Sequence, residues 1–115
     1  MIDDLIPSND EIKEAVRRLK LTTLQSQADS LIDESQRYVN AVEPALENKQ
    51  YRAARIAIVK AINAQEAAGG IYDQMLEVVE TEEEENKVRK MLVLTHNACS
   101  RMARILAQLP APEPK

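Results

Sequence analysis

Two long runs of apolar residues at helical spacing constrain this chain more than any other feature. Both alternate steps of three and four residues, which places their side chains on one side of a helix. The first is Leu24, Ala28, Leu31, Ile32, Ser35, Tyr38, Val39, Val42 and Leu46, and the second is Val88, Met91, Leu92, Thr95, Ala98, Cys99, Met102, Ile105, Leu106 and Leu109. Because each stripe must be hidden against another surface, the sequence predicts an all-α antiparallel helical bundle of four to five helices with a long C-terminal helix.

The length and composition indicate one domain. The chain has 115 residues, of which 44% are hydrophobic and 30% charged, as is typical of a soluble globular protein. It contains only two glycines, which argues against sheets and tight hairpins. We expect the bundle to span residues 1–109. Residues 110–115 are rich in proline and cannot continue a helix, so they are predicted to form a disordered tail.

Charge and cysteine usage restrict the partners and the compartment. The net charge is −4, whereas a domain that neutralises phosphates carries a basic excess, so nucleic-acid binding is disfavoured. The single cysteine cannot form an internal disulfide. No apolar stretch approaches the roughly 20 residues of a membrane span, and the acidic N-terminus lacks a signal-peptide core. These features predict a cytoplasmic protein without a membrane span.

Capping patterns predict the first two helices. Ser8 followed by Glu11 forms a capping box, which predicts a short helix over about 9–20. Thr22 and Thr23 then mark a break, and a second helix is expected over about 23–48. Because the apolar phase continues past Pro44, we expect a kink there and not an end.

The second half of the chain is expected to contain two or three more helices. A third helix is predicted over about 51–68, with an alanine-rich face that places it between two neighbours. Gly69 and Gly70 are expected to end it, since glycine tolerates the left-handed cap. Another segment begins at Ile71, and Thr81 with Glu84 predicts a helix start that leads to an end near Leu109. The alternative is one unbroken helix over 71–109.

No residue pattern indicates catalysis, a metal site or a cofactor. His96 is the only histidine and has no cysteine at ligand spacing, so a solvated histidine is the favoured interpretation. Cys99 falls inside the apolar stripe, where a thiol is usually inert, and no third group would orient a Cys–His pair. The acidic run Glu82–Glu85 lacks the glycine and alternating ligands of a calcium loop and is interpreted as a solvated helix start.

Two basic sets of residues are the candidate partner-binding sites. On the last helix, a set opposite the apolar stripe forms a basic outer face with one apolar member: Lys90, Val93, Asn97, Arg101 and Arg104. Such a face suits an acidic, partly apolar peptide. The second set is Tyr51, Arg52 and Arg55, of residue types enriched at binding hot spots. Although an ordinary solvated surface would look similar, the sequence predicts a non-enzymatic protein-interaction module, an adaptor or regulator.

Three alternatives remain open at this point. A homodimer would bury the long stripes and the alanine face, which would make the chain a structural or assembly protein. In the second alternative, the chain is a phosphotransfer intermediate with His96 as the phosphoacceptor. Residues 97–101, however, lack the lysine and glycine that follow the phosphoacceptor in such domains. In the third alternative, the chain contacts DNA through Arg17, Arg18 and Lys20, although its net negative charge disfavours such binding.

Residues 45–62 carry a resemblance to known helical hairpins. An alanine-containing helix is followed by a short polar turn, Tyr51, Ala54 and the pair Ala61–Ile62. This pattern resembles the centre of a tetratricopeptide repeat and the first hairpin of microtubule-interacting and trafficking (MIT) domains, whose third helix is similar to residues 101–106. The turn lacks the usual glycine, Pro44 interrupts the first helix, residues 69–81 are extra, and no second copy forms a repeat array. The resemblance implies recognition of short acidic or amphipathic peptides.

Overall fold

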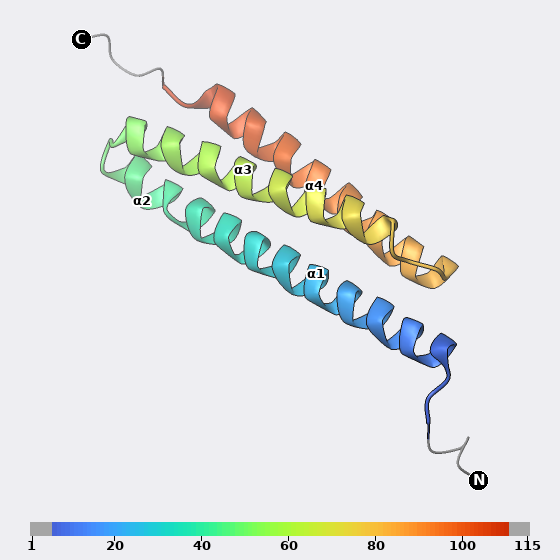
Figure 1. The fold of residues 1–115 in the computed structure, drawn as a ribbon. Coiled ribbons are helices and arrows are strands. Elements are labelled where there is room, and N and C mark those ends of the chain that lie inside the picture. The colour runs from blue at the N-terminus through green and yellow to red at the C-terminus, as the bar shows by residue number, and fades with distance from the viewer. Residues whose placement is uncertain (1–5, 111–115) are drawn as a thin grey trace.

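The computed structural model describes residues 6–110 as an antiparallel arrangement of helices (Figure 1). The elements are α1 (Asn9–Asn40), α2 (Val42–Glu47), α3 (Tyr51–Leu76) and α4 (Glu82–Gln108). The all-α class is confirmed. The described residues form three long helices, however, with the six-residue α2 continuing α1, so the expected bundle of four to five helices is corrected to three. All but the first residue of the predicted tail lies outside the described residues.

The N-terminal helix is longer than predicted. Ser8 Oγ accepts a hydrogen bond from the backbone N of Glu11 at 3.1 Å, which confirms the predicted start. The predicted short helix over 9–20 is wrong, because α1 continues without a break to Asn40. Thr22 does not interrupt it, since its hydroxyl donates to the backbone carbonyl of Arg18 at 3.0 Å and is satisfied within the helix.

Pro44 does not end the helical path, as expected, and the interruption lies three residues before it, at Ala41. Pro44 is the third residue of α2, so it cannot donate to the carbonyl four residues earlier, and its ring crowds that carbonyl. Ala41, between α1 and α2, has φ −82° and ψ −13°, which lie in the right-handed helical region. The backbone therefore stays close to helical across the interruption. The following turn places Lys49 at φ 58°, a left-handed conformation that glycine adopts more readily.

α3 ends later in the sequence than Gly69 and Gly70 predicted. α3 continues through Gly69 and Gly70 to Leu76, so the predicted end at residue 68 is wrong. Neither glycine has a positive φ. The chain breaks over 77–81, and Thr81 caps α4: its Oγ1 accepts from Glu84 N at 3.1 Å, while the Glu84 carboxylate accepts from Thr81 N at 3.3 Å. The predicted capping box is confirmed, and a single helix over 71–109 is excluded.

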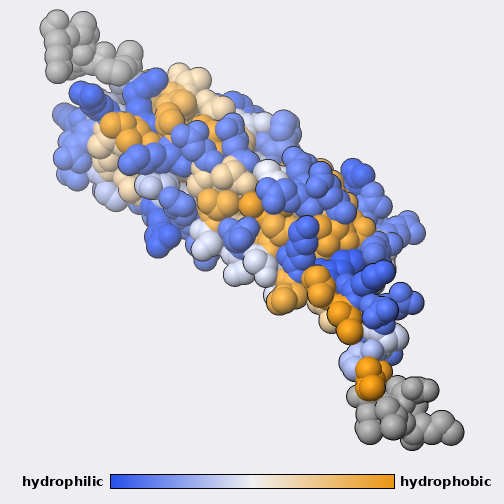
Figure 2. Space-filling view, viewed as in Figure 1, coloured by the Kyte–Doolittle hydropathy of each residue, from blue (hydrophilic) through white to orange (hydrophobic). Residues whose placement is uncertain are grey.

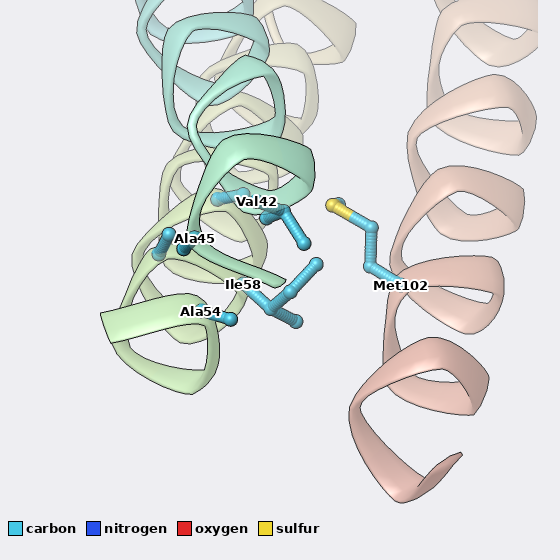
Figure 3. Packing of buried hydrophobic residues seen from close by; sticks show 7 residues of the cluster. Val42, Ala45, Ala54, Ile58 and Met102 are labelled. Carbon is cyan, nitrogen blue, oxygen red and sulfur yellow. The ribbon is translucent and has the colours of Figure 1, made fainter. Parts of the chain in front are cut away.

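α3 is the central element of the bundle. It packs against both α1 and α4, as its alanine-rich face predicted, whereas no Cα atom of α1 lies within 8 Å of one in α4. One core cluster joins Val42, Ile58 and Met102 near the α2 end (Figure 3), and the other joins Leu24, Tyr72 and Val88 near the α3–α4 turn.

Among the described residues, no helix combines the length and apolar character that a bilayer crossing requires.

Candidate functional site

A basic depression lies on the outward side of α3, and we call it the α3 basic groove. Its volume is about 510 Å³, and it is lined by Arg52, Arg55, Ile56, Val59, Lys60, Asn63 and Leu106. Three of these residues are cationic and none is acidic. At its centre, Ile56 is 46% exposed and Val59 is 42% exposed. The groove therefore combines uncovered apolar side chains with charge of a single sign.

Helical periodicity explains why these residues share one surface. Arg52, Ile56, Val59 and Asn63 follow the spacing of one helix stripe, opposite the alanines that pack into the core. Arg52 and Lys60 are eight residues apart, which separates them by roughly 12 Å along the helix axis. Two positive charges thus lie toward opposite ends of a short apolar surface.

Contacts with the neighbouring helices position two of the three cations. Arg55 Nη1 donates to the carbonyls of Leu106 at 3.5 Å and Leu109 at 3.4 Å, at the end of α4 where carbonyls lack helical partners. Lys60 Nζ lies 5.6 Å from the centroid of the Tyr38 ring on α1, within the range of a cation–π contact. Arg55 therefore also supports the fold, while Arg52 is exposed and forms no ion pair with another described residue.

The structure places the two predicted sets on different surfaces. Arg52 and Arg55 line the α3 basic groove, and Tyr51 is exposed at the first turn of α3 beside it. The α4 set is exposed on the side of α4 opposite its buried stripe, with Val93 58% exposed: Lys90, Val93, Asn97, Arg101 and Arg104. Sequence reasoning missed Ile56, Val59, Lys60 and Asn63, although the three-four spacing that continues from Arg52 was a usable signal.

His96 and Cys99 lie in another depression, between α3 and α4, together with Glu66 and Asp73. His96 is exposed, and the carboxylates near it disfavour a bound phosphoryl group by like-charge repulsion. Burial, and next the charge of Glu66, raise the pKa of the Cys99 thiol. A raised pKa reduces the thiolate fraction, which is the opposite of what a nucleophilic cysteine needs. No group of three or more potential metal ligands occurs among residues 6–110.

Two of the three cations considered for DNA contact form ion pairs, whereas Lys20 is exposed and forms none with a described residue. Arg17 Nη2 lies 2.6 Å from Glu14 Oε1, and Arg18 Nε lies 2.9 Å from the same oxygen. Arg17 also pairs with Glu84, and its side chain is only 11% exposed. These ion pairs offset part of the local positive charge, which weakens the attraction of Arg17 and Arg18 to a phosphate backbone.

No protein-family model, curated protein sequence or solved structure matches this chain. The likeness of residues 45–62 to MIT and tetratricopeptide hairpins therefore stays a prediction. That segment corresponds to the last turn of α2, the chain reversal and the first half of α3, where the α3 basic groove begins.

Proposed function

We propose that this chain is a non-enzymatic protein-interaction module that binds an acidic amphipathic helix of a partner protein in the α3 basic groove. The observation that carries the proposal is the grouping of Arg52, Arg55 and Lys60 around exposed Ile56 and Val59, with no carboxylate in the lining. An apolar centre with a charged rim is the arrangement used in helix-in-groove recognition.

The spacing of the charges specifies the partner further. A helix lying along α3 would meet Arg52 and Lys60 with two acidic residues seven or eight positions apart, because the two cations are roughly 12 Å apart along the axis. Apolar residues between them would cover Ile56 and Val59. The chain as a whole carries a net charge of −4, which disfavours docking of an acidic helix on surfaces without a basic cluster.

A selection from a library of helical peptides tests this proposal. Selected peptides should carry acidic residues seven or eight positions apart, and their affinity should fall as salt is added. The double variant Arg52→Glu and Lys60→Glu should weaken binding roughly tenfold. Arg55 is left intact because it also contacts α4.

The matched control is Lys90→Glu with Arg101→Glu on α4, which applies the same charge change to the other predicted surface. Binding should be unchanged in this control. If the α4 variant loses binding and the groove variant keeps it, the interface moves to the α4 set. Selected peptides without acidic enrichment would also contradict the proposal.

Self-association is a second candidate, favoured by a different surface. On the N-terminal third of α1, Ile12, Val16 and Leu19 share one stripe and are 49%, 60% and 66% exposed. Figure 2 shows exposed hydrophobic residues toward the end of the molecule that carries the N-terminus. A second copy of the chain would cover this stripe in a two-fold dimer.

Sedimentation velocity over a range of concentrations tests self-association. The wild-type chain should dimerise, and Val16→Glu should make it monomeric by placing a charge in the stripe. Lys13→Gln, which makes the net charge more negative by the same one unit on the same helix, serves as the control. A monomer mass that does not change with concentration would contradict the dimer.

A further inference from the structure

A second cavity lies between α1 and α4, separate from the α3 basic groove, and we call it the α1–α4 pocket. Its volume is about 440 Å³, within the range of roughly 300–1,000 Å³ that is usual for small-molecule sites. It exists because α3 packs against both helices while the backbones of α1 and α4 stay apart. Residues from all three long helices reach it, including Gln25 and Asp29 of α1, Met75 of α3, and Val88 and Met91 of α4.

One end of the pocket is closed along the bundle axis. At one end Glu84, which lines the cavity, pairs with Arg17 across the gap, with 2.9 Å between Oε1 and Nη1. Behind it, Leu24 and Tyr72 belong to the buried cluster that includes Val88. A cavity that is closed at one end and backed by the core suits a compact molecule better than a helix that lies along the bundle.

The pocket has polar or charged side chains on both α1 and α4. Gln25 Nε2 donates to Asp29 Oδ1 at 2.8 Å, and Asp29 is exposed and forms no ion pair with a described residue. The negative charge of Glu84 is offset by Arg17. Lys87 also lines the pocket, and its Nζ lies 3.6 Å from Glu83 Oε1. Asp29 is therefore the charged group of the lining without an ion-pair partner among the described residues, and it shares the pocket with the apolar side chains of Met75, Val88 and Met91.

A buried hydroxyl lies near the α1 residues of the pocket. Tyr72 is fully buried, and the Gln25 side chain is close enough to its hydroxyl to oppose part of the rise in its pKa, although no hydrogen bond of full geometry forms there. Burial, and next the charge of Asp29, raise the pKa of Tyr72, so the hydroxyl stays protonated beside that carboxylate.

We propose that the α1–α4 pocket binds a small amphipathic amine, with its ammonium group at Asp29 and its apolar body against Met75, Val88 and Met91. The charge of Asp29 selects a cationic donor, and an ammonium group donates to a carboxylate more strongly than a neutral donor does. The apolar lining selects a compact hydrocarbon or aromatic body. This site is independent of the proposed partner surface on α3.

Methionine methyl NMR tests the proposal on the full chain. Met75 and Met91 line the pocket, and Met102 belongs to the other core cluster, so ¹³C-methyl labelling supplies both a signal and an internal reference. The probes are 2-phenylethylamine and its neutral counterpart 2-phenylethanol. We expect saturable shifts at Met75 and Met91, none at Met102, and tighter binding of the amine.

Substitution of the carboxylate distinguishes the site from general attraction to an acidic protein. Asp29→Asn should weaken 2-phenylethylamine roughly tenfold and leave 2-phenylethanol unchanged, since it removes one charge-assisted hydrogen bond. Asp33→Asn, an exposed position on the same helix outside the pocket lining, should change neither. Arg52→Glu with Lys60→Glu should also leave the shifts unchanged, so this test does not depend on the partner surface.

Three results would each overturn the assignment. The first is the absence of saturable shifts at Met75 and Met91. The second is an equal shift at Met102, which would indicate a global change and not a local site. The third is an Asp29→Asn variant that binds the amine as tightly as the wild-type chain does.

Discussion

Arg17 Nη1 lies 2.9 Å from Glu84 Oε1, and this contact joins α1 to the first turn of α4 across 67 residues of sequence. The same carboxylate oxygen accepts from the backbone N of Glu80 at 3.1 Å and of Thr81 at 3.3 Å. Arg17 in turn donates to Glu14 within α1. Because α1 and α4 do not approach backbone to backbone, this network connects two helices that otherwise meet only through side chains.

Stability should fall in acid because of this network. Hydrogen bonding to Arg17 lowers the pKa of Glu84 from 4.5 to about 2, and hydrogen bonds to Arg17 and then Arg18 lower the pKa of Glu14 similarly. A carboxyl whose pKa is lower in the folded state stabilises the fold above its unfolded pKa and loses that contribution as pH falls through its folded pKa. We expect the melting temperature, measured by circular dichroism, to decrease between about pH 4.5 and 2.

A double-mutant cycle with Arg17→Met and Glu84→Gln isolates the pair from the other carboxyls. The coupling free energy should be favourable at neutral pH and disappear once Glu84 is protonated. The glutamine retains a carbonyl acceptor for the backbone of Glu80 and Thr81, so the α4 cap is preserved in this variant. A coupling free energy that is the same at neutral pH and at about pH 2 would contradict the assignment.

Local capping chemistry was the most predictable part of the fold. Ser8 and Thr81 each supply an oxygen to a backbone N three residues later, a signal contained within four residues of sequence. The predicted breaks at Thr22 and at Gly69–Gly70 were wrong, because packing of a long helix overrides weak local propensities. Periodicity identifies which residues share a helix face, but not whether two shorter helices join into one.

The α3 basic groove was only partly predictable for a related reason. Arg52 and Arg55 stood out by residue type, whereas Ile56 and Val59 were indistinguishable from core residues on an alanine-rich helix. Their exposure depends on α1 and α4 both packing on the other sides of α3. The α1–α4 pocket was not predictable, because it arises from the distance between two helices that are far apart in the sequence.

Replacing either mid-helix glycine with alanine should stabilise the protein. Gly69 and Gly70 both lie inside α3, where glycine costs about 1 kcal/mol relative to alanine. A Cβ at Gly69 would lie 3.7 Å from Thr95 Cγ2, an ordinary van der Waals contact, and one at Gly70 would meet nothing within 4 Å. We expect each variant to raise the melting temperature by about 4 °C. A decrease in either variant would show that the glycine is required for packing.

Ser35→Ala should destabilise the α1–α3 contact. Ser35 is buried, and its Oγ donates to the carbonyl of Ala61 at 2.9 Å. Loss of this hydrogen bond should reduce the free energy of unfolding by about 1 kcal/mol, as measured by urea denaturation. Ser30→Ala, at an exposed position of the same helix, is the matched control and should cost much less. Equal costs would show that the buried hydrogen bond contributes nothing beyond helix propensity.

Met102→Ala should be the most destabilising of these substitutions. Met102 extends from α4 toward Val42 and Ile58 (Figure 3) and is the member of this buried cluster that α4 supplies. Truncation of a buried methionine costs roughly 2–5 kcal/mol, because burial is lost and a cavity remains. Val93→Ala, at an exposed position of α4, is the matched control. Urea denaturation of both variants measures the difference, and a similar small loss in each would show that α4 is held mainly by the cluster near the α3–α4 turn.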